Sequence, residues 1–283
     1  MTTTTTEIGA TRGRTTKGRI PVVRKMGFDF TGLPRRWFGG RAIPSHVVNG
    51  LHLLFPAGER FFIRSVMHYM DRIADDPELV ARVRAFAAQE GRHGSEHEAA
   101  FDALEAQGFE IRKFLAWYNE LAWEKLEPKF PPSVRLAVTV ALEHFTASLA
   151  ERALGPDLLE SAHPIMRDLL KWHAAEEIEH KSVAFDVFEK VDGRYSVRVA
   201  GLVIATAALL GFWTVGTRML LKQERLSRAE IRAERAAGKN LGSHWGVIRK
   251  AFVEYLRPGF HPDDVPNDRL ALDYFVEIGR VNA

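Results

Sequence analysis

The sequence predicts an all-α protein whose main body is a bundle of long helices. Apolar residues recur at helical spacing from about residue 56 onward, and prolines and glycines divide this region into segments of helical length. No segment combines sustained apolar and polar alternation with turn signals, the pattern of half-buried strands. The 283 residues and 46% hydrophobic content are sufficient for a sizeable core.

Helix start and stop signals place five helices before residue 194. Pro56 opens the first, and Asp75 or Asp76 is expected to cap the second, which runs to about Gln107 and stops at Gly108. The expected helices cover about 56–74, 75–107, 110–127, 131–155 and 164–193. They define a bundle spanning residues 56–193.

The residues before this bundle have a different composition. Residues 1–19 are basic and of low complexity, which predicts a disordered tail, and they lack the apolar segment of a secretory signal. Residues 20–55 hold many prolines and glycines and predict an irregular N-terminal arm. We therefore expect a cytoplasmic protein, with a peripheral or membrane-associated position as the alternative.

The longest apolar run follows the bundle. Residues 199–217 carry no charge, and they predict an apolar helix over about 194–221. Basic residues lie on both sides of the run, which disfavours a single membrane span. The helix is therefore expected to be buried or to contact a membrane. Residues 222–283 predict a C-terminal extension of two or three helices, and its arginine-rich start suits a solvated helix or a membrane surface.

Composition narrows the chemistry. The chain has no cysteine, which excludes disulfides, thiolate metal sites, iron–sulfur clusters and cysteine nucleophiles. The formal net charge of +3 is too balanced for a nucleic-acid-binding surface. Any metal ion must be held by His, Asp or Glu.

Two helices carry the same short motif of metal-ligating residues. Glu90 and His93 form one Glu-x-x-His pair, and Glu177 and His180 form another. Residues three apart lie on the same helix face, so each pair presents a carboxylate and an imidazole together. One such pair is common by chance.

Two further glutamates complete the pattern. Glu59 and Glu143 lie among apolar neighbours on two other helices, where an isolated carboxylate would be costly. Each precedes a Glu-x-x-His pair by a similar interval. One Glu on each of two helices and Glu-x-x-His on two others is the ligand set of dinuclear carboxylate bundles. The alternative for these residues is solvated helix faces with surface ion pairs.

With these residues in order, the region 56–190 resembles the ferritin-like di-iron carboxylate superfamily. The sequence segments "QEGRH" and "WHAAEEIEHKSVAFDV" also resemble those of a bacterial family described, by prediction, as metal-dependent hydrolases. The resemblance implies a ferritin-like four-helix bundle with additional C-terminal helices and a pair of metal ions. Two iron ions are expected, with manganese or a mixed pair as alternatives.

A third histidine lies on the same stripe. His173 precedes Glu177 by four residues, and the His-x-x-x-Glu-x-x-His spacing resembles that of di-iron aryl-amine N-oxygenases. We therefore include His173 as a ligand, the alternative being a histidine that packs near Trp172. His97 is a further ligand, a residue behind the ligands, or a structural histidine. Glu176 and Glu179 flank the stripe, and we expect them to be solvated.

The resemblance favours an oxidoreductase. We expect Glu59, Glu90, His93, Glu143, Glu177 and His180 to carry O2-dependent hydroxylation, desaturation or N-oxygenation of a lipophilic small molecule, with a separate electron donor. The alternative is a hydrolase of an ester or phosphoester that uses the same two-metal site. A third hypothesis is a metal-storage or structural bundle. A homodimer and a membrane contact through residues 199–217 are open alternatives, and no nucleic-acid partner is expected.

Overall fold

The computed structural model describes residues 18–237 and 244–280. Helices dominate these ranges, which contain no β-strand, only isolated bridges of Phe38 with Arg41 and Ala162. The predicted all-α class is therefore confirmed. The predicted disordered tail, residues 1–19, lies outside the described residues except for its last two positions.

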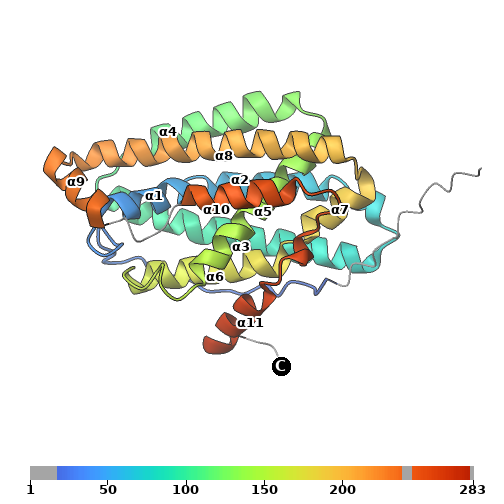
Figure 1. Cartoon of the computed structure of the whole chain (residues 1–283), viewed down its shortest axis with the longest axis horizontal. Coiled ribbons are helices and arrows are strands. Elements are labelled where there is room, and N and C mark those ends of the chain that lie inside the picture. Colours follow the sequence, from blue (N-terminus) through green and yellow to red (C-terminus); the bar gives the residue numbers. More distant parts are fainter. Residues whose placement is uncertain (1–17, 238–243, 281–283) are drawn as a thin grey trace, which may run out of the picture.

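Four helices form the central bundle: α2 (Phe55–Met67), α3 (Pro77–Ala106), α5 (Pro132–Ala153) and α6 (Pro164–His180). Helix α2 packs against α3 and α5, and α6 packs against the same two helices. In Figure 1 the bundle helices run along the long axis of the molecule. A long connection separates α3 from α5, so this arrangement is compatible with the predicted ferritin-like bundle.

The helix ends follow the predicted signals. The Asp76 carboxylate accepts a hydrogen bond from the backbone N–H of Leu79 at 3.0 Å, so Asp76 is the residue that caps α3. Gly108 follows the end of α3 with a φ of +85°, a left-handed conformation that glycine adopts without strain. Prolines open α5 and α6 in their first turns.

The helix expected over 110–127 is irregular. Helix α4 (Arg112–Tyr118) continues as a π-helix (Asn119–Leu126). Trp123, in the wider turns, stacks on Phe61 of α2 with ring centroids 4.9 Å apart. This tertiary aromatic contact has no counterpart in the local sequence pattern.

The prediction of a single helix from Pro164 to Gly193 is wrong. Helix α6 ends at His180, and a separate helix, α7 (Val183–Val191), follows. Lys181 lies in the break with its ammonium group buried, donating to Val265 O at 2.9 Å and Asn267 Oδ1 at 2.7 Å. Contacts with the C-terminal segment, about 85 residues away in sequence, therefore accompany the break.

The prediction that residues 20–55 are wholly irregular is also wrong, because they contain α1 (Ala42–His52). Pro44 lies in its first turn, where proline is compatible with a helix. The N–H groups of Ala42 and Ile43 donate to the carboxylate of Glu234 at 2.8 and 2.6 Å. Glu234 belongs to α9 (Arg228–Ala237), so a distant helix caps α1.

The apolar run lies in α8 (Tyr195–Glu224), which packs against α5 and α1. Among the described residues, this helix alone is long and apolar enough to cross a membrane, and 28% of its most apolar window is buried. Figure 1 shows α8 beside α4 on one side of the bundle. Two more helices, α10 (His244–Tyr255) and α11 (Asp268–Glu277), follow as expected. A membrane contact stays a prediction.

Gly201 allows the close approach of α8 to α5. A Cβ atom there would lie 2.5 Å from the carbonyl carbon of Ala137, whereas one on Gly211 of the same helix would meet nothing within 4 Å. We expect Gly201→Ala to lower the free energy of unfolding by about 1–3 kcal/mol through overpacking. Gly211→Ala should raise it by roughly 0.5–1 kcal/mol. Urea unfolding of both variants checks this, and equal shifts would contradict it.

Candidate metal centre

The seven predicted ligands converge inside the bundle. All seven residues are buried, none more than 4% exposed. Helix α2 supplies Glu59, α3 supplies Glu90 and His93, α5 supplies Glu143, and α6 supplies His173, Glu177 and His180. Their roles as metal ligands stay a prediction.

Three glutamates, Glu59, Glu90 and Glu177, each belong to more than one group of neighbouring ligand atoms. Glu90 groups with Glu59 and His93 on one side and with Glu177 and His180 on the other, with donor atoms within 4.8 Å of one another. Glu177 also groups with His93 and His173. Overlapping groups that share the carboxylates of Glu90 and Glu177 match the ligand set of a pair of ions.

The spacing within the cluster suits ligands around ions. His180 Nε2 lies 3.0 Å from Glu90 Oε1 and 3.3 Å from Glu143 Oε2. Neither contact makes a hydrogen bond, since His180 Nε2 and these carboxylates lack a hydrogen-bond partner. Atoms each about 2.1 Å from one ion at octahedral positions lie about 3 Å apart, so the observed separations fit shared coordination.

Buried polar atoms without partners gather here. Both oxygens of Glu59, Glu90 and Glu143 lack a hydrogen bond, as do Glu177 Oε2, His93 Nδ1 and His180 Nε2. Each such atom is costly to bury unless something replaces the lost water. Cations would satisfy all of them at once, so the residues present fit a dinuclear metal site. Oxygen and imidazole donors without sulfur suit iron, manganese or zinc.

Without cations, the cluster keeps its charges partly neutralised by protons. Burial and the Glu90 charge raise the pKa of Glu59 well above its ordinary value, and burial and the Glu90 charge likewise raise that of Glu143 to about 8. Burial opposes protonation of His93 and His180, but adjacent carboxylates raise both pKa values well above the ordinary one. Burial also disfavours ionised Glu177, but the neighbouring histidines hold its pKa well below the usual range.

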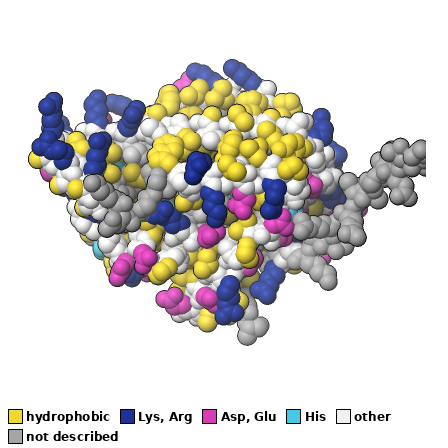
Figure 2. All heavy atoms as spheres, in the orientation of Figure 1, with side chains coloured by type: hydrophobic (Ala, Val, Ile, Leu, Met, Phe, Trp, Pro, Cys, Tyr) yellow, Lys and Arg dark blue, Asp and Glu magenta, His cyan; other side chains and the backbone are white. Residues whose placement is uncertain are grey.

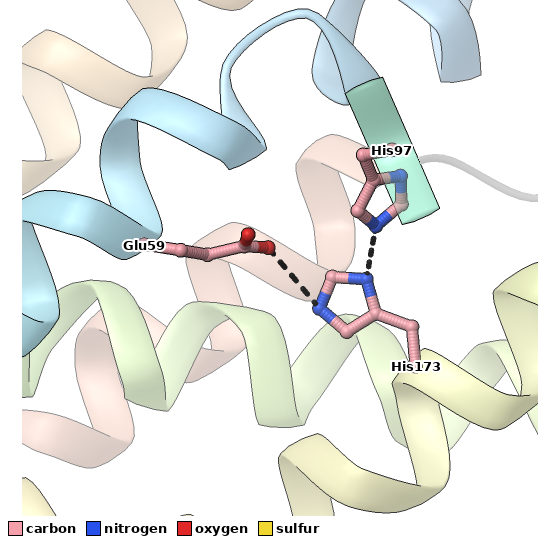
Figure 3. A group of neighbouring side chains, drawn as sticks. All are labelled: Glu59, His97 and His173. Carbon is pink, nitrogen blue, oxygen red and sulfur yellow. Dashed lines mark hydrogen bonds and ion pairs between the residues drawn. The ribbon is translucent and has the colours of Figure 1, made fainter. Parts of the chain in front are cut away.

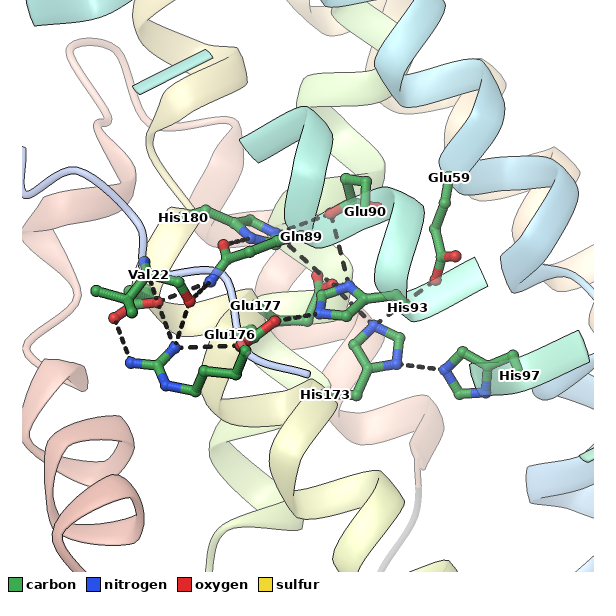
Figure 4. Close-up of polar contacts among 12 residues, drawn as sticks. Val22, Glu59, Gln89, Glu90, His93, His97, His173, Glu176, Glu177 and His180 are labelled. Atoms are coloured by element: carbon green, nitrogen blue, oxygen red, sulfur yellow. Dashed lines mark hydrogen bonds and ion pairs between the residues drawn. The ribbon is translucent and has the colours of Figure 1, made fainter. Parts of the chain in front are cut away.

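A second layer of side chains orients the two Glu-x-x-His imidazoles. His93 Nε2 contacts Glu176 Oε2 at 3.0 Å, which leaves Nδ1 facing Glu177 and Glu90. His180 Nδ1 contacts Gln89 Oε1 at 2.9 Å, which leaves Nε2 facing the carboxylates (Figure 4). Such partners fix the orientation of metal-ligating histidines.

The N-terminal arm joins these two partners. Arg24 Nη1 donates to Glu176 Oε1 at 3.2 Å and to Glu179 Oε2 at 2.9 Å. Glu179 Oε2 also accepts from Gln89 Nε2 at 2.7 Å. One arginine therefore connects the supports of both histidines. The expectation that Glu176 and Glu179 are solvated is wrong, because Glu176 is fully buried and Glu179 mostly so.

A chain of imidazoles leads away from His173. Its Nε2 lies 2.8 Å from Glu177 Oε1 and 3.9 Å from Glu59 Oε1. On the other side, His173 Nδ1 contacts His97 Nε2 at 2.6 Å (Figure 3). His97 Nδ1 in turn contacts His52 Nδ1 at 3.2 Å. His97 thus lies behind His173, although it also groups with Glu59 and His173. Its role as an extra ligand or support stays a prediction.

The sequence analysis missed Arg24, Gln89 and His52. The available signal for Gln89 was its position, because this polar residue lies beside Glu90 and follows small apolar residues of the same helix. Arg24 and His52 lie in the segment predicted to be an irregular arm, and no helical periodicity linked them to the ligands. Only the tertiary fold brings them to the site.

The pKa values predict how the metal-free protein responds to pH. Glu59, Glu143, His93 and His180 have raised pKa values in the folded chain. Their stabilising contribution is full below each unfolded pKa and is lost as the pH rises through the folded pKa. The melting temperature should therefore fall between about pH 7 and pH 9, where Glu143 titrates.

Metal loading should reduce this fall, because bound cations keep the carboxylates ionised throughout the range. The lowered pKa values of Glu177 and His173 contribute no slope there, because both groups are already deprotonated in the folded and unfolded states. Calorimetry with a chelator and with added Mn²⁺ measures the difference. Identical pH profiles would contradict the expectation.

The arm contact predicts a remote effect on metal affinity. Arg24→Ala removes the group that joins Glu176 to Glu179, so we expect metal affinity to weaken about 10- to 100-fold. Lys25→Ala, at the exposed neighbouring position, is the matched control and should leave affinity unchanged. Competition with a chromophoric chelator measures both. Equal affinities of the two variants would show that the arm does not support the centre.

Comparison with known proteins agrees with a metal site. The family described as "Predicted metal-dependent hydrolase" matches residues 22–265, which include the arm, the bundle and most of the C-terminal extension. No curated protein matches the chain, and no solved structure does. The match covers most of the sequence and contains every residue of the cluster. The chain therefore belongs to the family of predicted metal-dependent hydrolases.

Proposed function

We propose that this protein is a two-metal enzyme that hydrolyses an ester or phosphoester bond of a largely apolar substrate. The observation that carries the proposal is the convergence of two Glu-x-x-His pairs and two further glutamates, whose buried donor atoms lack partners. The family description supports hydrolysis as the reaction class. Overall, water adds across the bond, and an acid and an alcohol leave.

The seven residues of the cluster would hold the two ions: six belong to the overlapping ligand groups, and Glu143 lies 3.3 Å from His180. Such ions polarise an ester or phosphoester oxygen and make water a better nucleophile at neutral pH. The protein contributes orientation through Glu176 and Gln89, which hold the imidazoles of His93 and His180. This support fixes the positions that the reaction requires.

His173 connects the centre to two further buried imidazoles, those of His97 and His52. If Nε2 faces the ions, Nδ1 carries the proton and donates to His97 Nε2. His97 Nδ1 then donates to His52. Burial, with the neighbouring histidines, lowers the pKa of His97 and His52, so both rings are held neutral. Neutral imidazoles in series suit proton transfer, because each offers one donor and one acceptor.

Two cavities reach the cluster. A cavity of about 610 Å³ is lined mainly by apolar side chains and touches Glu59. A second cavity, of about 400 Å³, touches His173 and Glu177. Apolar walls next to buried carboxylates keep bulk water from the reacting bond and suit a lipophilic substrate.

O2-dependent oxidation is the second candidate. The donor set favours oxidation, because four carboxylates with a third imidazole resemble the ligands of the di-iron oxygenases. The third imidazole is that of His173, whose Nε2 lies 2.8 Å from Glu177 Oε1. A pair of iron ions, or manganese or a mixed pair, would supply redox chemistry to a hydroxylation, desaturation or N-oxygenation. This reaction needs O2 and a separate electron donor. A cytoplasmic location and a homodimer stay predictions.

Turnover without oxygen separates the two reactions. Protein loaded with Mn²⁺ or Fe²⁺ is incubated anaerobically with p-nitrophenyl esters and phosphoesters of increasing alkyl length. We expect metal-dependent release of p-nitrophenol that Glu90→Gln abolishes, because Glu90 lies between both ligand groups. Chelated protein is the control.

Oxygen consumption by the reduced iron-loaded protein tests the oxygenase candidate. Uptake of O2 with substrate oxidation, together with no anaerobic cleavage, would replace hydrolysis by the oxygenase candidate. The same experiment with His173→Ala shows whether the third imidazole belongs to the site, since a structural histidine would leave the metal spectra unchanged.

A further inference from the structure

We propose that the larger cavity binds one long apolar chain, the alkyl or acyl chain of a single-chain amphiphile, with the reacting end of the molecule at Glu59. The cavity lies between α2, α5, α8 and the segment formed by α4 and the π-helix. The position of the reacting end rests on the proposed function, whereas binding of the chain does not.

The shape of the cavity suits a chain. Residues of α8 from Val203 to Val215 line it. At about 1.5 Å per residue, this stretch of helix is about 18 Å long. The cavity therefore extends along more than three turns of α8, and a compact molecule would leave much of this length unfilled.

The chemistry of the wall orients such a ligand. Most of the lining is aliphatic or aromatic, including Leu54, Phe61, Phe62, Leu142, Ile204 and Phe212. Three charged residues line it: Glu59, Glu127 and Arg135. Glu127 pairs with Arg64 at 2.7 Å and lies 3.7 Å from Arg135, whereas Glu59 belongs to the candidate metal centre. The polar end of a ligand is therefore expected at Glu59.

The cavity opens through an apolar surface. Four large apolar residues of its lining are exposed: Val203 by 54%, Val215 by 44%, Trp117 by 40% and Leu126 by 38%. They lie on α8, α4 and the π-helix, and Figure 2 shows apolar side chains gathered over α8 and α4. An apolar entrance favours entry of a hydrocarbon chain and disfavours a strongly hydrated substrate.

The smaller cavity offers a separate route for a polar reactant. It reaches His173 and Glu177, and its wall includes Arg41, Glu234 and Arg235. The two cavities share Phe55 and three other lining residues, Leu51, Thr146 and Leu149, so they meet beside the cluster. A chain could occupy the larger cavity while water reaches the centre through the other.

Chain-length dependence of binding tests the inference. Saturated fatty acids from octanoic to palmitic acid compete with a fluorescent fatty acid on the wild-type protein, metal-free and Mn²⁺-loaded. We expect affinity to rise roughly fourfold per methylene group, since each buried CH₂ contributes about 0.8 kcal/mol, until the cavity is full. No saturable binding, or affinity independent of length, would overturn the proposal.

Matched variants locate the site. Ala208→Trp fills the cavity from α8 and should weaken binding of the longest chain more than 10-fold. Ala200→Trp places the same side chain on an exposed position of α8 outside the cavity lining and should have no effect. Ala207→Trp, also in the lining, replaces Ala208→Trp if that variant fails to fold. Equal affinities in the lining and control variants would place the ligand elsewhere.

Two further measurements distinguish a dissolved from a membrane source of the bound alkyl chain, and distinguish failure of this inference from failure of the proposed function. Binding of monomeric fatty acid identifies a dissolved ligand, and faster transfer from phosphatidylcholine vesicles as vesicle concentration rises identifies a bilayer source. Absence of binding from both overturns the proposal. Chain binding without ester turnover would reject the proposed function and keep this inference. Turnover that is independent of alkyl length would reject the inference and keep the function.

Discussion

The structure depends on one electrostatic constraint: four carboxylates buried in the same bundle cannot all be ionised without cations between them. Glu59, Glu90, Glu143 and Glu177 come from four helices, and their oxygens face one another with few hydrogen bonds. Protons can neutralise part of this charge, as the raised pKa values of Glu59 and Glu143 show. Two divalent cations neutralise all of it and satisfy the unpartnered atoms together.

The segments outside the four-helix bundle support the metal centre and form part of the cavity that leads to it. Arg24 of the arm binds Glu176 and Glu179 and packs over the Phe275 ring of α11, with 3.4 Å from the guanidinium carbon to the ring centroid. The N-terminal arm and α11 therefore meet at the supports of the ligating histidines. On the opposite side, α8 closes the apolar cavity that leads to Glu59. Ligands, their orientation and substrate access thus come from different parts of the chain.

The sequence revealed what is local and missed what is tertiary. Glu-x-x-His spacing places two ligands on one helix face whatever surrounds the helix, so Glu90 with His93 and Glu177 with His180 were predictable. Helix ends marked by Asp76 or by prolines were predictable for the same reason. The break at Lys181 and the π-helix involve distant partners, and the contacts of Arg24 span more than 150 residues. No periodicity within a helix encodes such contacts.

The central claim, that this cluster holds a pair of metal ions, is tested most directly by anomalous X-ray diffraction from crystals grown with Mn²⁺. The account predicts two anomalous peaks inside the bundle, separated by the carboxylates of Glu90 and Glu177. One peak should adjoin Glu59 and His93, and the other should adjoin Glu143 and His180. A single peak in the cluster, or ions bound only elsewhere in the molecule, would contradict it.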